Sequence, residues 1–93
     1  MVLLLFLVNI FLGEVKMKNI TTLSSLREGQ RCRVKSLMIE GAMRSRLGEL
    51  GLIEGAQVEC VHRSASGDPA AYCICGALIA LRNSDSSGVI VYT

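Results

Sequence analysis

Two pairs of soft donors are the residues of this chain that could hold a metal ion. Cys60 and His62 are separated by one residue, as are Cys73 and Cys75, and this spacing predicts that each pair shares one face of a β-strand. Thiolate and imidazole groups bind transition metals, so a hairpin carrying both pairs could bring four ligands to Fe²⁺ or Zn²⁺. These four residues are therefore the candidates for a metal site.

The alternation of side chains argues against a common site. Cys60 has the same phase as Val58, which the pattern places in the core, whereas Cys73 and Cys75 have the outward phase of their own strand. The chain also lacks the C-x₂₋₄-C spacing that is usual in zinc sites. We therefore expect a buried Cys60, two outward thiols, a His62 at the end of its strand, and no required metal or other cofactor.

Catalytic groups are not indicated. His62 is the single histidine, and no G-x-S-x-G, Walker or H-E-x-x-H motif accompanies it. The eight acidic residues are scattered along the chain, so no pair of carboxylates is indicated for acid-base work. The sequence predicts no catalytic residue and a protein that is not an enzyme.

The charges favour a protein partner over a nucleic acid. Ten Lys and Arg residues and eight Asp and Glu residues give a net charge of +2, and only 4% of the residues are aromatic. A domain that binds nucleic acid usually has a stronger basic excess and more stacking side chains. Arginine is favoured at protein interfaces, so we expect Arg44, Arg46 and Glu49, all in a predicted helix, to bind a partner.

Short strands and one helix are predicted to position these groups. A length of 93 residues allows one small domain. A helix over 42–50 places Met43, Leu47 and Leu50 on one apolar stripe and ends at Gly51. The segment 83–88 is predicted to be a turn, and strands are predicted over 31–36, 57–62, 72–75, 78–82 and 89–92. This succession is typical of a small closed barrel, so the expected fold class is mainly β.

The first 16 residues differ from the rest of the chain. Residues 2–12 are almost entirely apolar but are too few to span a bilayer as a helix. They also lack the basic start and the cleavage site of a signal peptide. Because codons for Glu14 and Val15 can encode a ribosome-binding element just before Met17, we interpret residues 1–16 as a hydrophobic leader from a mis-assigned start and residues 17–93 as the domain. The alternative is a genuine extension that docks on the domain or lies at a membrane surface.

An ordered set of short motifs covers residues 22–92. The most specific motif is RLGELGLIEG at 46–55, and the others are LREGQRCRV at 26–34, GDP at 67–69, Gly76 and ALR at 80–82. In this order and at these spacings, the motifs resemble the FeoA family, the small cytoplasmic component of bacterial ferrous iron transport.

The resemblance implies an SH3-like β-barrel with one short helix inserted, similar also to the C-terminal domain of DtxR-type metal repressors. It implies a cytoplasmic accessory protein that binds and modulates FeoB, the membrane GTPase that transports Fe²⁺, and that is recruited to the inner face of the membrane by this partner. Neither a nucleic-acid partner nor a membrane span of its own is expected, and a weak homo-oligomer stays open.

Three residues depart from the family pattern. Glu54 stands where proline is common, and Cys73 and Cys75 stand where charged residues are usual. The two cysteines keep a second function open, that of a small metal-binding protein or metallochaperone with thiolate ligands.

Overall fold

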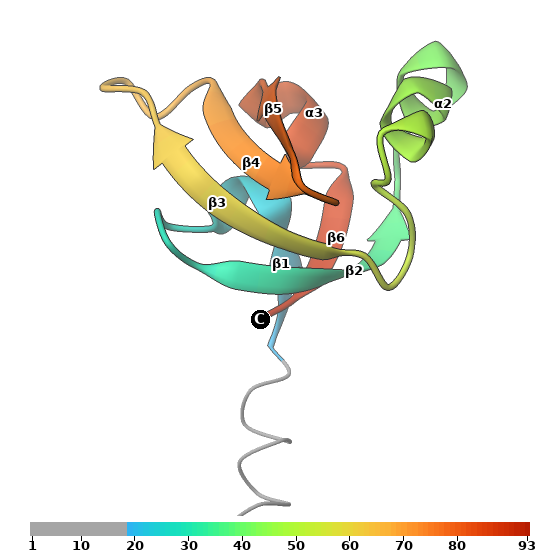
Figure 1. Ribbon diagram of the computed structural model, residues 1–93, viewed down its shortest axis with the longest axis horizontal. Coiled ribbons are helices and arrows are strands. Elements are labelled where there is room, and N and C mark those ends of the chain that lie inside the picture. Colours follow the sequence, from blue (N-terminus) through green and yellow to red (C-terminus); the bar gives the residue numbers. More distant parts are fainter. Residues whose placement is uncertain (1–18) are drawn as a thin grey trace, which may run out of the picture.

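Residues 19–93 are described by a computed structural model, in which one antiparallel sheet curls around a core and a helix stands at its side (Figure 1). The elements are β1 (Ile20–Thr22), the 3-10 helix η1 (Leu23–Ser25), β2 (Arg31–Leu37), α2 (Gly41–Glu49), β3 (Gln57–Arg63), β4 (Ala70–Ile74), β5 (Ala77–Leu81), α3 (Asn83–Ser86) and β6 (Val89–Tyr92). The mainly β fold predicted from the sequence is confirmed. The leader interpreted over residues 1–16 lies outside the described residues.

The strands form a single six-stranded sheet in the order β1-β6-β2-β3-β4-β5. Along four neighbouring strands, β2 to β5, the register places Arg31 opposite Glu59, Glu59 opposite Cys73, and Cys73 opposite Leu78. The residues beside Arg31, Glu59 and Cys73 in their strands are buried, and residues paired across strands share a face, so these four side chains lie on the outer face of the sheet. We call them the outer row.

The core follows the predicted alternation. Cys32 and Val34 of β2 point inward and are buried, as are Val58 and Cys60 of β3. Tyr72 is the largest fully buried side chain, and its hydroxyl donates to the carbonyl oxygen of Leu23 at 3.3 Å. The remaining buried apolar residues are Leu23, Leu26, Leu37, Leu47, Leu52, Ala70, Ile74, Leu81, Val89 and Val91.

The helical insertion leaves the sheet after β2 and returns before β3 (Figure 1). Near its base, the chain before β3 still bonds to β2. The N–H of Val34 donates to the carbonyl of Ala56 at 2.9 Å, and the N–H of Gly55 donates to the carbonyl of Val34 at 2.8 Å. The two strands are therefore joined beneath the insertion.

Helix α2 is attached to the barrel by fewer leucines than predicted. Leu47 is buried and Met43 packs partly against the core, but Leu50 is 40% exposed, so its predicted place on the buried stripe is wrong. Leu50 is the C-terminal cap residue, where the chain leaves the helix. Leu52 enters the core in its place.

The end of α2 has the hydrogen bonds of a Schellman motif. Gly51 has a positive φ of 98°, its N–H donates to the carbonyl of Gly48 at 3.0 Å, and the N–H of Leu52 donates to the carbonyl of Leu47 at 2.9 Å. The predicted stop at Gly51 is confirmed. The motif explains the correction above, because it reverses the chain so that Leu52, two residues after Leu50, packs with Leu47.

The short elements β1 and α3 were not predicted. β1 has three residues, too few to show an alternating pattern, and it is held by antiparallel pairing with β6. The predicted turn over 83–88 contains α3, whose first residue, Asn83, donates its N–H to Asp68 Oδ1 at 2.9 Å. Its Ser86 is fully buried. Contacts distant in the sequence therefore support both elements.

Candidate functional site

The four predicted metal ligands do not meet. Cys60 is fully buried in the core, whereas His62 is exposed, with Nδ1 3.2 Å from Glu28 Oε1. Cys73 lies on the outer face and Cys75 is exposed. Among residues 19–93, no group of three or more His, Cys, Asp or Glu side chains is placed to hold a metal ion.

The prediction that Cys60 and His62 share one strand face is wrong. The register of β3 against β4 shifts between these residues: Cys60 lies opposite Tyr72, but His62 lies opposite Ala71. Such a shift marks a β-bulge, where an extra residue interrupts the alternation of side chains. Val61 and His62 are consequently both exposed, and the imidazole turns away from the thiol of Cys60.

The two buried thiols are in environments that favour the neutral form. Burial raises the pKa of Cys32 from 9.0 to about 11, and the neighbouring Cys60 adds to the shift. Burial also raises the pKa of Cys60, against the opposing effect of Arg63. Thiolates are the forms that bind metals and react with electrophiles, so neither buried cysteine suits such a role in the folded protein.

The raised pKa of Cys32 predicts a loss of stability in alkali. Below pH 9 the thiol is protonated in both states, but between about pH 9 and 11 the unfolded state loses this proton and the folded state keeps it. The free energy of unfolding should therefore fall over this window, by up to about 2–3 kcal/mol. Urea unfolding of wild type and Cys32→Ala at several pH values measures this contribution. If the free energy of unfolding fell equally with pH in both proteins, the prediction would be contradicted.

A groove of about 360 Å³ opens on the outer face of the sheet. It contains three members of the outer row, Arg31, Glu59 and Cys73, and its other lining residues are Gln57, Val58, Cys75 and Gly76. Arg31 Nε lies 3.0 Å from Glu59 Oε1, so the acidic group in this groove is paired. Two thiols therefore remain as its soft donors.

Cys75 is positioned by an unusual turn. It forms, with Gly76, the two-residue connection between β4 and β5, and both residues have positive φ, 49° and 80°. Positive φ at both central residues is the pattern of a type I′ hairpin turn, whose first position usually holds Asn, Asp or Gly. A cysteine there is uncommon.

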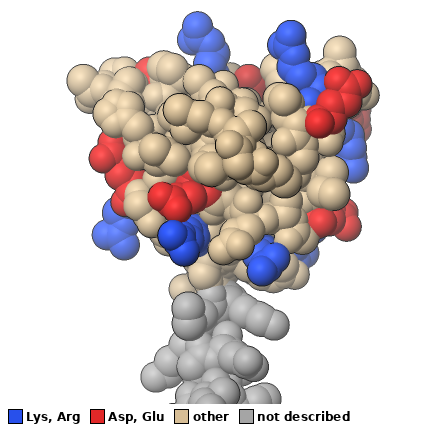
Figure 2. Space-filling model, viewed as in Figure 1, with Lys and Arg blue, Asp and Glu red and all other residues tan. Residues whose placement is uncertain are grey.

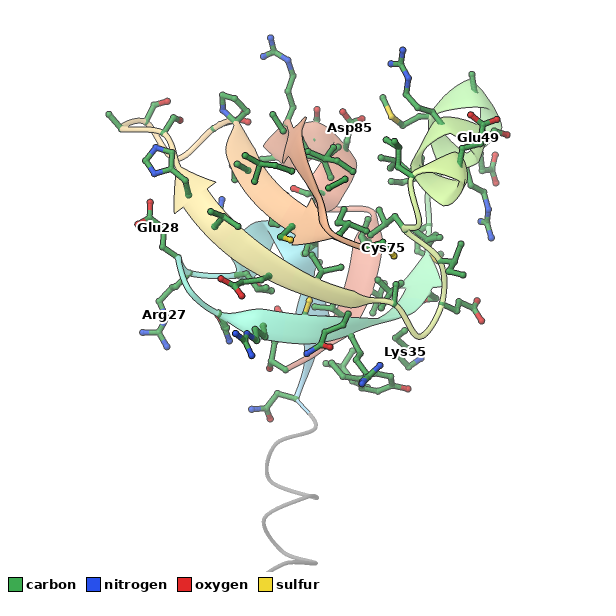
Figure 3. All side chains as sticks on the ribbon, in the orientation of Figure 1. Arg27, Glu28, Lys35, Glu49, Cys75 and Asp85 are labelled. Carbon is green, nitrogen blue, oxygen red and sulfur yellow. The ribbon has the colours of Figure 1, made fainter. Side chains whose placement is uncertain are left out.

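The thiol of Cys75 rests against the end of helix α2. Its Sγ donates a weak hydrogen bond to the carbonyl of Gly51 at 3.7 Å, and Figure 3 shows Cys75 near the loop below the helix. A Cβ at Gly51 would lie 2.6 Å from this sulfur. Gly51 therefore both ends the helix and leaves room for the thiol.

The predicted partner-binding residues have two different environments. Arg44 Nη1 donates to the carbonyls of Leu37 at 3.0 Å and Ile39 at 3.4 Å, so this guanidinium ties α2 to the end of β2. Arg46 and Glu49 are exposed, and neither forms a salt bridge within residues 19–93. The structure thus leaves these two charges available on α2.

The surface carries charges of both signs. Figure 2 shows Lys and Arg side chains interspersed with Asp and Glu around the rim of one face, whose centre is largely uncharged. Exposed apolar side chains flank α2 in the sequence: Met38 (72% exposed), Leu50 and Ile53. Apolar and charged side chains are therefore combined around this helix, as in many protein interfaces.

Arg63 was not identified from the sequence as an important residue. Its Nε donates to the carbonyl of Leu26 and its Nη2 to that of Ser24, both at 2.6 Å. Its Nη1 donates to the carbonyl of Gly67 at 3.2 Å. This single side chain thus joins the end of β3 to the η1 segment and to the loop before β4.

The antiparallel six-stranded sheet with a helix inserted between β2 and β3 defines a small SH3-like domain. A family model, the FeoA domain, matches residues 21–93. The chain therefore belongs to the FeoA family, the small accessory proteins associated with ferrous iron transport. The family resemblance seen in the sequence is therefore confirmed. A comparison with curated proteins found no match.

Solved structures of the family are similar to this chain. The FeoA protein of Chlorobium tepidum is 35% identical, over 77% of this chain and 69% of that chain, with a TM-score of 0.74. The FeoA of Stenotrophomonas maltophilia, described as an SH3 domain protein and solved with zinc, is 31% identical, over 76% of this chain and 88% of that chain, with a TM-score of 0.68.

The fold is also shared outside the family. A manganese-dependent transcriptional repressor superposes with a TM-score of 0.72 at 14% identity, over 82% of this chain and 42% of that chain. The expected likeness to a repressor domain is thus confirmed at the level of fold. In the part of the chain that the structure describes, no helix has the length and apolar character needed to cross a bilayer.

Proposed function

We propose that this chain is a cytoplasmic accessory protein that binds the cytoplasmic part of FeoB and modulates ferrous iron uptake, with helix α2 as part of the contact. The observation that supports this proposal is that α2 buries one side chain, Leu47, and leaves most of its remaining surface uncovered. Recruitment to the inner face of the membrane would follow from that contact.

The exposed side chains of α2 suit a protein partner. Arg46 and Glu49 supply charges that can select a complementary surface and speed association. Leu50, at the end of the helix, supplies apolar area that a partner can cover. Arg44 is also exposed, but its guanidinium holds the helix to the carbonyls of Leu37 and Ile39, so Arg46 is the cleaner residue for a test.

Charge reversal at Arg46 tests the proposal. Arg46→Glu should weaken binding to the purified cytoplasmic domain of FeoB by about 5- to 30-fold, corresponding to about 1–2 kcal/mol for a like charge placed in the contact. The loss should shrink as salt is added, because exposed charges are screened. Titration calorimetry at low and high salt measures both effects.

The matched control is Arg27→Glu. Arg27 is also exposed, and Figure 3 places it on the opposite side of the molecule from Glu49 of α2. It should bind as wild type does. Equal affinities for wild type and Arg46→Glu, or equal losses in both variants, would place the contact elsewhere.

A further inference from the structure

Cys73 and Cys75 are two thiols that line one groove, and the proposed partner contact uses neither of them. Cys73 reaches the groove from the outer face of β4, and Cys75 reaches it from the β4–β5 turn. Neither is fully buried, so both are open to solvent. The other two cysteines of the chain lie in the core.

We propose that Cys73 and Cys75 together bind one soft monovalent cation, Cu(I), as a two-coordinate bis-thiolate. Binding releases the two thiol protons to solvent and forms two Cu–S bonds without any change of oxidation state. The resulting site has a net charge of −1, and the guanidinium of Arg31 lines the same groove.

The donor set selects this class of ion. Soft thiolates prefer Cu(I), whereas structural zinc takes four ligands in a tetrahedron. No third His, Cys, Asp or Glu side chain joins the two thiols among residues 19–93, and the one acidic side chain in the groove, Glu59, is paired with Arg31. Residues 19–93 therefore do not supply the four side chains of a tetrahedral Zn²⁺ site, whereas a two-coordinate site needs only the two thiols.

The β4–β5 turn offers a reason for a cysteine at position 75, the second proposed ligand. Cys75 has a left-handed backbone conformation that Asn, Asp or Gly adopts more readily, so a cysteine here is a costly choice for a simple turn. Its sulfur has one weak partner, the carbonyl of Gly51. Exchanging that contact for a Cu–S bond loses little, and Gly51 has no side chain to obstruct the thiol.

The test is a copper competition under anaerobic conditions. Cu(I) is offered as its coloured bicinchoninate complex, and the full chain is expected to withdraw one Cu(I) per molecule. Loss of a second-shell partner typically weakens a metal site about 10- to 100-fold, so loss of a ligand should cost at least about 100-fold. Cys73→Ser and Cys75→Ser should each show this loss, whereas the matched control Cys60→Ala, which retains both groove thiols, should bind as wild type does.

Alkylation of the wild-type protein maps the site without any substitution. Trypsin cleaves after Arg63 and Arg82, so peptide 64–82 contains Cys73 and Cys75 and no other cysteine. Bound Cu(I) should protect this peptide from iodoacetamide. Copper uptake that survives in both serine variants, absence of protection in peptide 64–82, or one copper shared by two chains would each overturn the proposal.

Discussion

Arg63→Met is expected to lower the free energy of unfolding by about 2–4 kcal/mol. The guanidinium donates to the carbonyls of Ser24 and Leu26 at 2.6 Å, and these part-buried groups would lose their charged donor. Hydrogen bonds to charged groups contribute about 1.5–3 kcal/mol each, and an acceptor left unpaired adds a desolvation cost. Methionine retains much of the apolar stem, so the change isolates the loss of the donors.

Urea unfolding followed by circular dichroism measures this effect. The control is Arg82→Met, because Arg82 is exposed and its side chain forms no hydrogen bond or salt bridge within residues 19–93. It should change stability by less than about 0.5 kcal/mol. Similar midpoints for the two variants would show that Arg63 does not join the segments around it.

Leu47→Ala should lower the free energy of unfolding by about 2–5 kcal/mol, the range for a buried leucine that leaves a cavity. Leu47 is 1% exposed and is the one residue of α2 that is buried. Loss of the Leu47 side chain should also loosen the helix. In the variant, the amide hydrogens of α2 should therefore exchange faster than those of the barrel strands.

The neighbouring leucine provides the control. Leu50 is 40% exposed, so Leu50→Ala should cost less than about 0.5 kcal/mol. Thermal or urea unfolding of both variants distinguishes the structure from the apolar stripe expected from the sequence. Equal losses for Leu47→Ala and Leu50→Ala would restore that stripe and contradict the position of Leu50 described here.

Local patterns were sufficient to predict strands β2 to β6 and most of their buried faces. The alternation around Cys32 and Val34, and around Val58 and Cys60, needs only near neighbours to be recognised, and both pairs are buried. The position of Leu52 also had a local signal that was overlooked. In a Schellman motif, the residue after the glycine packs on the last turn of the helix, and Leu47-x-x-x-Gly51-Leu52 fits this rule.

Other features depend on distant parts of the chain. The two shortest hydrogen bonds of the Arg63 side chain reach residues 37 and 39 positions away, so nothing beside it in the sequence indicates its role. The bulge after Cys60 is likewise a property of the pairing between β3 and β4, not of β3 alone. The groove needs side chains from three strands and a turn, so its thiols could be recognised as donors but not placed together.

The bonds from Val34 to Gly55 and Ala56 close the strand ladder below the point where α2 projects. The hydrogen bonds between β2 and β3 therefore do not depend on the helix, although Leu47 of α2 packs in the core. The exposed surface of α2 can therefore change without loss of any hydrogen bond in this ladder.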